Sequence, residues 1–135
     1  MRWMLDTDTC IAFINRERKQ PSQRIDTKPL DKVGISSIVL AELHAGVAKS
    51  EACIRNAEEL CSFLVAVEIL PFDEPAAALY GAIRARLERR GTPIGPMDLL
   101  IAAHAMSVNV TLVTHNTREF ERLADLHVED WMKAN

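Results

Sequence analysis

Short apolar runs alternate with longer helical patterns along the whole chain, and this alternation constrains the fold more than any other feature. Four runs predict strands, and a fifth predicts an edge strand: Trp3–Leu5, Val33–Ser36, Glu68–Leu70, Val110–Val113 and His127–Val128. Strands separated by helices form βαβ units, because parallel strands need a crossover connection. The sequence therefore predicts an α/β fold with a central, mainly parallel sheet.

The segments between the strands carry helical patterns whose ends can be recognised. Helices are expected over these stretches: Thr9 to about Lys19, Ser36 or Ser37 to about Ser50, Glu51–Val65, Pro75 to Gly91, Met97–Ser107 and Arg118–Ala124. A serine cap, a proline in the first turn and a terminal glycine set several of these boundaries. The polar stretch from Pro21 to Asp31 is expected to be a loop or an irregular segment.

Length and composition limit the class of protein. The chain has 135 residues, of which 48% are hydrophobic and 26% charged, so one globular domain over residues 1–135 is expected. No apolar run approaches the ~20 residues that cross a bilayer, and the first residues do not form a signal peptide. A cytoplasmic protein without membrane contact is therefore expected. Cys10, Cys53 and Cys61 include no CxxC pair and are expected to be buried, inert thiols.

The charge is unevenly distributed along the chain. A net charge of −3 is not typical of a nucleic-acid-binding protein. Eleven of the sixteen basic residues are arginine, however, and four arginines fall within the stretch Arg84–Arg90. Arg86 and Arg90 are one helical turn apart and could contact phosphates, or they could simply belong to a solvated helix face.

Acidic or amide side chains follow the predicted strands or begin a helix beside one. Five residues share this placement: Asp6, Glu42, Asp98, Asn116 and Glu119. Ligands of parallel sheets bind beyond the carboxyl ends of the strands. These side chains are therefore expected to lie along one edge of the sheet.

Each of the leading acids also has a purely structural explanation. Glu42 lies in a helix that is apolar almost all round, where a glutamate is unusual unless it is paired or coordinates an ion. It could instead pair with an arginine, or its helix could be less buried than the pattern indicates. Asp98 could act only as a helix cap. At the first strand, Asp8 could cap the next helix while Asp6 serves as a turn residue.

A cation would explain why acids gather at one place. Two unit charges about 5 Å apart repel by roughly 3 kcal/mol at an effective dielectric constant of 20. A divalent cation neutralises this repulsion, and ligands that are all oxygen favour Mg²⁺ or Mn²⁺ over zinc. The sequence therefore predicts a magnesium site of the kind used in phosphate chemistry.

The chain contains three motif blocks in order: LDTDTCIAFI, ISSIVLAELHAG and IGPMDLLIAAHAMSVNVTLVTHNTREFERL. Together they resemble the signature blocks of PIN-domain ribonucleases, and among these the VapC-type toxins of bacterial toxin–antitoxin pairs. The resemblance implies a three-layer α/β/α fold, an Mg²⁺-dependent endoribonuclease with Mn²⁺ as a possible substitute, and an antitoxin that occludes the site. The ending HVEDW is similar to the subgroup that cuts the anticodon stem-loop of initiator tRNA. A tRNA is therefore the expected substrate.

Position by position, the resemblance assigns metal-binding roles to Asp6, Glu42 and Asp98. The fourth acidic position of many PIN domains falls on Asn116, and Glu119 follows three residues later; these two would position a second metal, a water or a phosphate. The implied reaction is hydrolysis of an RNA phosphodiester by a metal-activated water, leaving a 5′ phosphate and a 3′ hydroxyl. Asp8, commonly asparagine in this subgroup, is expected to cap the first helix or to hold a metal-bound water.

Two other functions are compatible with parts of the sequence. DTDTC after an apolar strand also resembles the DxDx(T/V) motif of haloacid-dehalogenase-type phosphatases, but Cys10 stands at the last motif position and a second acidic block is missing. A PIN-like module that binds RNA or protein without catalysis is the other alternative. Among the histidines, His44 and His104 are expected to make local hydrogen bonds, and His115 to be an exposed loop residue that could touch RNA.

The sequence also predicts partners. Apolar residues of the helix Glu51–Val65, including Phe63 and Leu64, would suit an antitoxin segment or a second subunit of a homodimer. Packing against the domain's own core would account for the same residues.

Overall fold

Three buried residues near the N-terminus form the central strand of the sheet. The computed structural model describes residues 1–15 and 30–132. Strand β1 (Trp3–Leu5) is buried along its whole length, as expected for a strand that is covered on both faces. It pairs in parallel with β2 (Val33–Ser36) on one side and with β4 (Thr111–Val113) on the other.

Two further parallel strands complete the sheet. Strand β3 (Glu68–Leu70) pairs with β2, and β5 (Val128–Glu129) pairs with β4, which gives the order β3-β2-β1-β4-β5. All four pairings are parallel, so the five carboxyl ends lie along one edge of the sheet. Any side chain that directly follows a strand is thereby brought to this edge.

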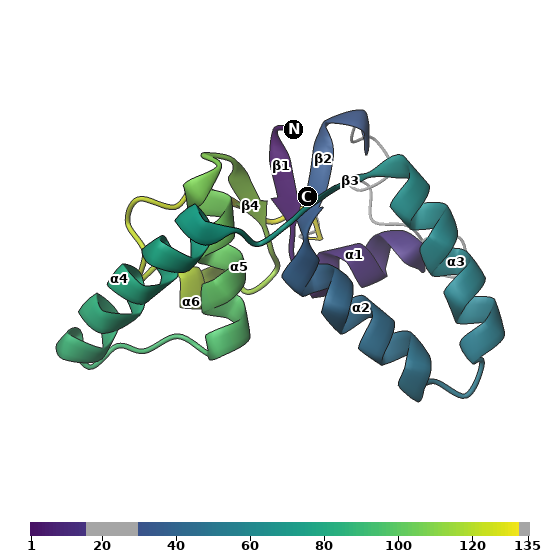
Figure 1. Ribbon diagram of the computed structural model, residues 1–135, viewed down its shortest axis with the longest axis horizontal. Helices are drawn as coiled ribbons and strands as arrows, with labels where there is room; N and C mark the ends of the chain where they lie inside the picture. Colours follow the sequence, from purple (N-terminus) through teal and green to yellow (C-terminus); the bar gives the residue numbers. More distant parts are fainter. Residues whose placement is uncertain (16–29, 133–135) are drawn as a thin grey trace.

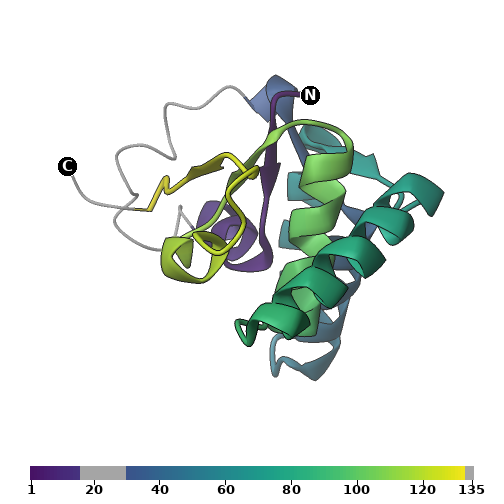
Figure 2. The same ribbon diagram turned by 90° about the vertical axis from the view of Figure 1, so that its left-hand side faces the viewer.

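Helices cover both faces of the sheet. One side carries α1 (Thr7–Ile14), α2 (Ser37–Lys49) and α3 (Cys53–Ala66), which contact one another. The other side carries α4 (Glu74–Arg90), α5 (Pro96–Ser107) and the short α6 (Thr117–Phe120). A single 3₁₀ turn, η2 (Leu30–Lys32), leads into β2. Figure 1 shows the sheet nearly edge-on between the two helical layers, and Figure 2 shows α4 lying along α5. The arrangement is the three-layer α/β/α fold that the sequence predicted.

The predicted elements agree closely with this structure. The first three strands have the expected bounds, β4 begins one residue later, and β5 lies one residue further along. Helix α2 begins after a Ser36 cap, whose hydroxyl accepts the backbone N–H of Ile38 at 3.1 Å, and α4 ends at Gly91 with φ of 72°. The last helix is only one turn long rather than seven residues. Lys19 and most of the predicted loop lie outside the described residues. Within those residues, no helix is long and apolar enough to cross a bilayer.

The cysteine prediction was wrong for two of the three residues. Cys10 is fully buried, and burial raises the pKa of its thiol well above the usual range. Cys53 and Cys61 are exposed. Helix α3 buries a stripe that contains Leu60 and Phe63, and the two cysteines lie off that stripe. Their exposure depends on which face of α3 meets the domain, which composition does not reveal.

The C-terminal motif HVEDW closes the core beside β1. Trp131 is fully buried, and its ring packs edge-on against Trp3 and Phe13 at centroid distances of 5.4 and 6.2 Å. The carboxylate of Glu129 accepts hydrogen bonds from both indoles, at 3.2 Å from Trp3 and 3.0 Å from Trp131. This motif therefore anchors the last strand to the first, and its tryptophan is a core residue.

Replacing Trp131 should strongly destabilise the fold. Trp131→Ala is expected to lower the free energy of unfolding by about 3–5 kcal/mol, because it removes a fully buried aromatic side chain. Trp131→Phe keeps most of the packing but loses the bond to Glu129, so it should cost less. Urea denaturation followed by circular dichroism measures both, with Lys32→Ala, at an exposed residue, as control. An unchanged midpoint for Trp131→Ala would contradict this packing role.

Candidate active site

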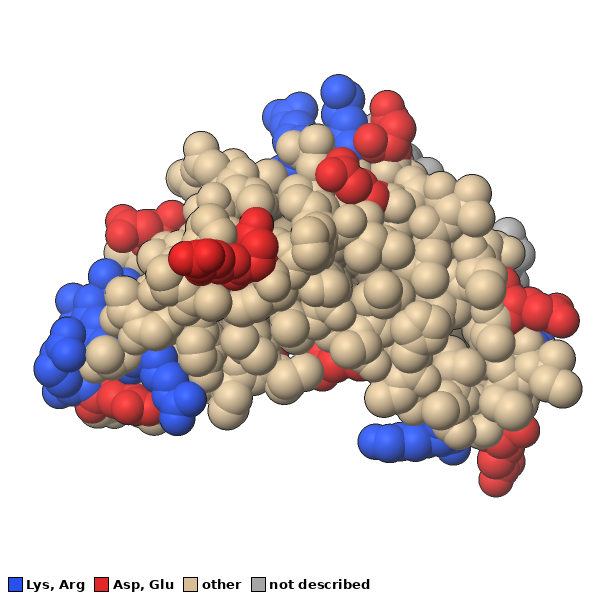
Figure 3. Space-filling view, viewed as in Figure 1, with Lys and Arg blue, Asp and Glu red and all other residues tan. Residues whose placement is uncertain are grey.

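Four carboxylates from four different elements face a common region at the carboxyl edge of the sheet. Asp6 directly follows β1, Glu42 lies in α2, Asp98 in the first turn of α5, and Glu119 in α6. The clearest sign of their proximity is electrostatic: the pKa of Asp98 is raised to about 6, first by burial and then by the charges of Glu119, Asp6 and Glu42. Figure 3 shows acidic side chains in the hollow at the lower edge of the molecule, between the two helical layers.

Asp6 is fixed by both the sheet and the first helix. Its backbone N–H donates to the carbonyl of Val113 at 3.0 Å, which continues the ladder between β1 and β4. Its side chain accepts the N–H of Thr9 at 3.0 Å and so caps α1. The carboxyl group is buried, and this burial raises its pKa although hydrogen bonds from Thr114 and Thr9 oppose the shift.

This geometry corrects the roles that were expected for Asp6 and Asp8, the two aspartates of the DTD sequence. Asp8 was expected to cap the first helix or to hold a metal-bound water. Asp6 is the cap, and Asp8 is exposed within the first turn, so only the second role stays a prediction. The helix begins at Thr7, directly after the strand, so the position before it is the one that can reach the free N–H groups. Asp6 therefore combines strand end, helix cap and site residue.

Glu42 points back toward α1. Its carboxylate accepts a hydrogen bond of 2.6 Å from the hydroxyl of Thr7, and the residue is half-buried. None of the described arginines forms an ion pair with it. Helix α2 is less buried than its apolar sequence indicated, since only Val39 and Leu43 are fully covered. The alternative that this helix is less buried than its pattern indicates is therefore correct, but the side chain of Glu42 is still held at the site.

Asp98, Asn116 and Glu119 meet around the turn that precedes α5. Glu119 accepts the backbone N–H of Gly95 at 3.0 Å through one oxygen, and the side-chain amide of Asn116 at 2.8 Å through the other. A Cβ atom at Gly95 would lie 3.8 Å from Glu119 Oε1 and 4.0 Å from Asp98 Oδ2, so the two carboxylates converge on this glycine. Helix α5 has no side-chain cap, which removes the helix-cap explanation for Asp98.

The donor set suits a hard divalent cation. No described lysine, arginine or histidine forms an ion pair with any of the four carboxylates, so no side chain in the described part neutralises them. Among the described residues, no three acidic, cysteine or histidine side chains are already close enough to form a complete metal cage. Magnesium does not require one, because it keeps several waters and takes only one or two carboxylates from the protein. The residues present therefore fit an Mg²⁺ or Mn²⁺ ion that shares its shell with water.

Threonine hydroxyls support this site, and sequence reasoning missed them. Thr7 holds Glu42, while Thr9 and Thr114 hydrogen-bond Asp6. The signal was present in the DTDT motif and in the threonine that follows β4. Short hydroxyl side chains at strand ends are common in turns, so their type alone did not mark them as site residues.

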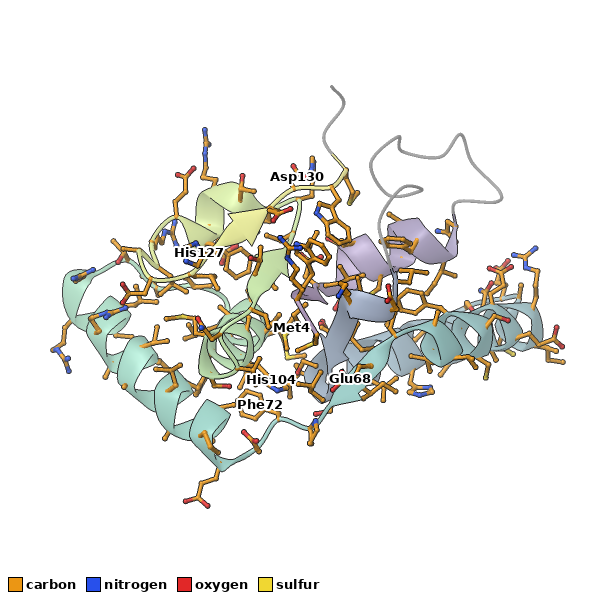
Figure 4. The ribbon with its side chains drawn as sticks, turned by 90° about the horizontal axis from the view of Figure 1, so that it is seen from above. Met4, Glu68, Phe72, His104, His127 and Asp130 are labelled. Carbon is orange, nitrogen blue, oxygen red and sulfur yellow. The ribbon has the colours of Figure 1, made fainter. Side chains whose placement is uncertain are left out.

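The histidines lie outside the acidic cluster. His104 is buried, accepts or donates a 2.7 Å hydrogen bond with Ser36 Oγ, and packs edge-on against Phe72 (Figure 4). Burial lowers its pKa. This confirms the expected local hydrogen bond. His44 is exposed, and His115 pairs with Asp130 at 3.0 Å in an exposed loop.

The charge of Asp98 should destabilise the metal-free protein as the pH rises. Its pKa is about 6 in the folded state against 3.8 ordinarily, so between these values the native state binds more protons than the unfolded one. The raised pKa of Asp98 contributes fully to the free energy of unfolding below pH 3.8, and this contribution is lost as the pH rises through about 6. In EDTA, Asp98→Asn should gain about 2–3 kcal/mol over the wild type between pH 4 and pH 7.5.

Urea denaturation of both proteins across this pH range measures that difference. Asp31→Asn is a matched control, because Asp31 is exposed and precedes β2 at the opposite edge of the sheet. If the free energies of unfolding of wild type and Asp98→Asn changed with pH in the same way, the raised pKa of Asp98 would be contradicted.

Comparisons with known proteins agree with this geometry. Residues 3–126 match the PIN domain family model. The chain is 43% identical over 131 residues to the tRNA(fMet)-specific endonuclease VapC of Salmonella typhimurium, covering 97% of this chain and 98% of that protein. It is also 43% identical over 137 residues to ribonuclease VapC2 of Rickettsia felis, covering 98% and 100%. The crystal structure of DNA-bound VapBC from Salmonella typhimurium superimposes with a TM-score of 0.89, at 42% identity over 97% of this chain and 98% of that one.

Proposed function

The chain belongs to the PIN-domain family, among its VapC-type ribonucleases, and we propose that it is the toxin of a toxin–antitoxin pair that cleaves a tRNA with the help of Mg²⁺. The observation that carries this proposal is the gathering of Asp6, Glu42, Asp98 and Glu119 at one edge, where no cationic side chain of residues 1–15 or 30–132 pairs with them. A purely structural site would gain nothing from four mutually repelling acids. A site for phosphate chemistry needs them.

The proposed roles follow from how each side chain is held. Asp6 and Asp98 would hold the Mg²⁺, and Glu42 would complete its shell or orient the attacking water, with Mn²⁺ as a possible substitute. When bound, this ion supplies positive charge to the phosphoryl oxygens and makes water more acidic. Glu119 is held by Gly95 and Asn116, so it stands ready to accept a proton or to position the water. Asn116 is directed by Glu119 and would face the substrate phosphate.

The tRNA part of the proposal rests on the relative from Salmonella typhimurium, whose name specifies tRNA(fMet). Within the HVEDW motif, Trp131 is buried and Glu129 accepts hydrogen bonds from two indoles, so these two residues support the fold. Recognition of the RNA would come from exposed residues of the domain. The initiator tRNA anticodon stem-loop is the leading candidate substrate.

An apolar groove beside the site suits an antitoxin segment. It lies between α1, α2 and α3, has a volume of about 450 Å³, and is lined by residues that include Ile11, Leu43, Val47, Leu60 and Glu42. Ile11 is 42% exposed, so the floor is open to a partner. Because Glu42 belongs both to this groove and to the site, a segment seated here would lie against the acids and block RNA.

The expected contact residues on α3 need correction. Phe63 is 7% exposed and packs into the core, and Leu64 is half-buried. The apolar residues that α3 leaves open are instead Ile54 and Val65, at 77% and 89% exposure. The side of α3 that packs inward could not be chosen from its sequence. We propose that the protein is a homodimer, with this outer face of α3 as the contact between subunits.

RNA cleavage should depend on the ion and leave defined ends. With Mg²⁺ or Mn²⁺, the purified protein should cut initiator tRNA in its anticodon loop and leave a 5′ phosphate and a 3′ hydroxyl. Asp98→Asn should lower the rate by at least about 100-fold, since it removes a proposed ligand, while Asp31→Asn should cut normally. Sequencing of the new ends checks the products. A 2′,3′-cyclic phosphate, or full activity in EDTA, would exclude this chemistry.

The groove should bind the product of an adjacent small gene. Ile11→Glu places a charge in the apolar floor and should weaken that complex by about tenfold or more. Ala78→Glu, on the exposed face of α4, should leave it intact. Light scattering gives the mass of each sample and also shows whether the toxin alone is a dimer. A strictly monomeric protein that binds no partner would contradict the toxin assignment.

A further inference from the structure

The end of α4 carries an arginine surface that the proposed catalytic chemistry does not use. We define the α4 arginine patch as Arg86, Arg89, Arg90 and Arg122. We infer that this patch binds the phosphate backbone of a structured RNA, holding the stem while the loop enters the acidic site. This inference rests on the proposed ribonuclease function and adds the surface that would give the enzyme its affinity for a folded RNA.

The chain as a whole does not attract nucleic acid. Its net charge is −3, and its site gathers four carboxylates, so an approaching phosphate backbone meets repulsion at the place where it must be cut. Binding of RNA at physiological salt depends on arginine and lysine contacts to phosphates. A protein of this charge therefore needs a local basic surface, separate from its acids.

The arginines of the patch are not neutralised by the chain itself. On the same helix, Arg84 pairs with Glu88 at 2.9 Å and donates a hydrogen bond to the Tyr80 hydroxyl at 3.0 Å. Arg84 is therefore already paired and is not part of the patch. Within the described residues, Arg89 and Arg90 form no ion pair, and both are exposed. Figure 3 shows basic side chains gathered at this end of the molecule, with acidic atoms beside them. Glu88 is held by Arg84, which leaves the charges of Arg89 and Arg90 available to a ligand.

Arg86 adds a further guanidinium to this surface. It is half-buried, and its Nε is shielded from solvent with no hydrogen-bond acceptor among the described residues. A phosphate would therefore contact the other N–H groups of this side chain. A guanidinium presents its N–H groups in a rigid fork that matches two phosphate oxygens.

The patch is connected directly to the site. Helix α4 ends at Arg90, and the turn from Gly91 to Gly95 leads straight into α5, which carries Asp98 in its first turn. Arg122 donates to the carbonyl of Pro93 and so fixes this turn from the α6 side. In Figure 1 the end of α4 and the start of α5 both lie at the lower edge of the molecule, joined by the turn between them.

This placement favours a folded RNA over a short single strand. Seven residues lie between Arg90 and Asp98, so the two are at most about 28 Å apart when the chain is fully extended. A strand that only fills the acidic site ends before it reaches the arginines. An RNA whose cut loop is attached to a helical stem presents phosphates beyond the loop, where the patch lies, and such stems are recognised chiefly through backbone and shape.

The test measures RNA binding in EDTA, where no cleavage is needed. The probes are a labelled initiator tRNA transcript and a labelled oligouridine just long enough to fill the acidic site, each titrated by fluorescence anisotropy from 50 to 200 mM salt. The patch variant is Arg89→Gln with Arg90→Gln. The matched control, Lys32→Gln with Arg55→Gln, removes two exposed positive charges elsewhere on the molecule. Melting curves verify that both variants fold.

The patch variant should bind tRNA about tenfold more weakly near 150 mM salt, and its salt dependence should fall by about 1.4–1.8 in slope, as expected for two lost phosphate contacts. The control should change by less than about twofold, and oligouridine binding should be little affected by either variant. Equal losses for patch and control would overturn the inference. The inference would also be overturned if the patch variant lost affinity equally for tRNA and for oligouridine. The same holds if it bound tRNA normally and lost only its affinity for the antitoxin.

The outcome for the patch is separate from the outcome for catalysis. A wild type that binds tRNA through the patch but cuts no RNA with Mg²⁺ would refute the ribonuclease proposal and support the patch. If the wild type cuts tRNA, and the patch variant and the control variant bind tRNA equally well, the ribonuclease proposal is supported and the patch is refuted.

Discussion

Repulsion among carboxylates at one edge of the sheet is the interaction on which the rest of this structure depends. Asp6, Glu42, Asp98 and Glu119 are held near one another by four separate elements, and burial together with the charges of the other three raises the pKa of Asp98 to about 6. A folded chain tolerates such a cluster only if its core supplies enough stability to hold it. The fully buried β1, the apolar α5 and the aromatic group around Trp131 supply that stability.

The same backbone that builds the core also aims the acids. Asp6 continues the hydrogen-bond ladder of β1 with β4 and caps α1, so neither its backbone nor its side chain can move without disturbing the sheet. Glu119 ties the turn before α5 to the loop after β4 through Gly95 and Asn116. The hydrogen bonds that complete the fold therefore also position the site residues. A rigid site of this kind needs little reorganisation when an ion and a phosphate arrive.

Much of this could be predicted from the sequence, because it depends on local pattern. The strands follow from short β-branched runs, and the edge location of Asp6 and Asp98 follows from parallel connectivity. What could not be predicted depends on which helix face meets the domain: the exposure of Cys53 and Cys61, and the burial of Phe63. The role of Asp6 as helix cap was missed because α1 begins directly after the strand, with no linking residue. The motif HVEDW predicted a subgroup with a tRNA substrate, which stays a prediction, and its tryptophan is a core residue.

The central claim is that the acids converge in order to hold a divalent cation. Mn²⁺ binding followed by electron paramagnetic resonance tests this most directly, because it observes the ion itself and needs no RNA. Wild-type protein should bind Mn²⁺, Asp98→Asn should bind it at least tenfold more weakly, and Asp31→Asn, changed at the opposite edge, should match the wild type. Equal binding by wild type and Asp98→Asn, or no binding by the wild type, would contradict the claim.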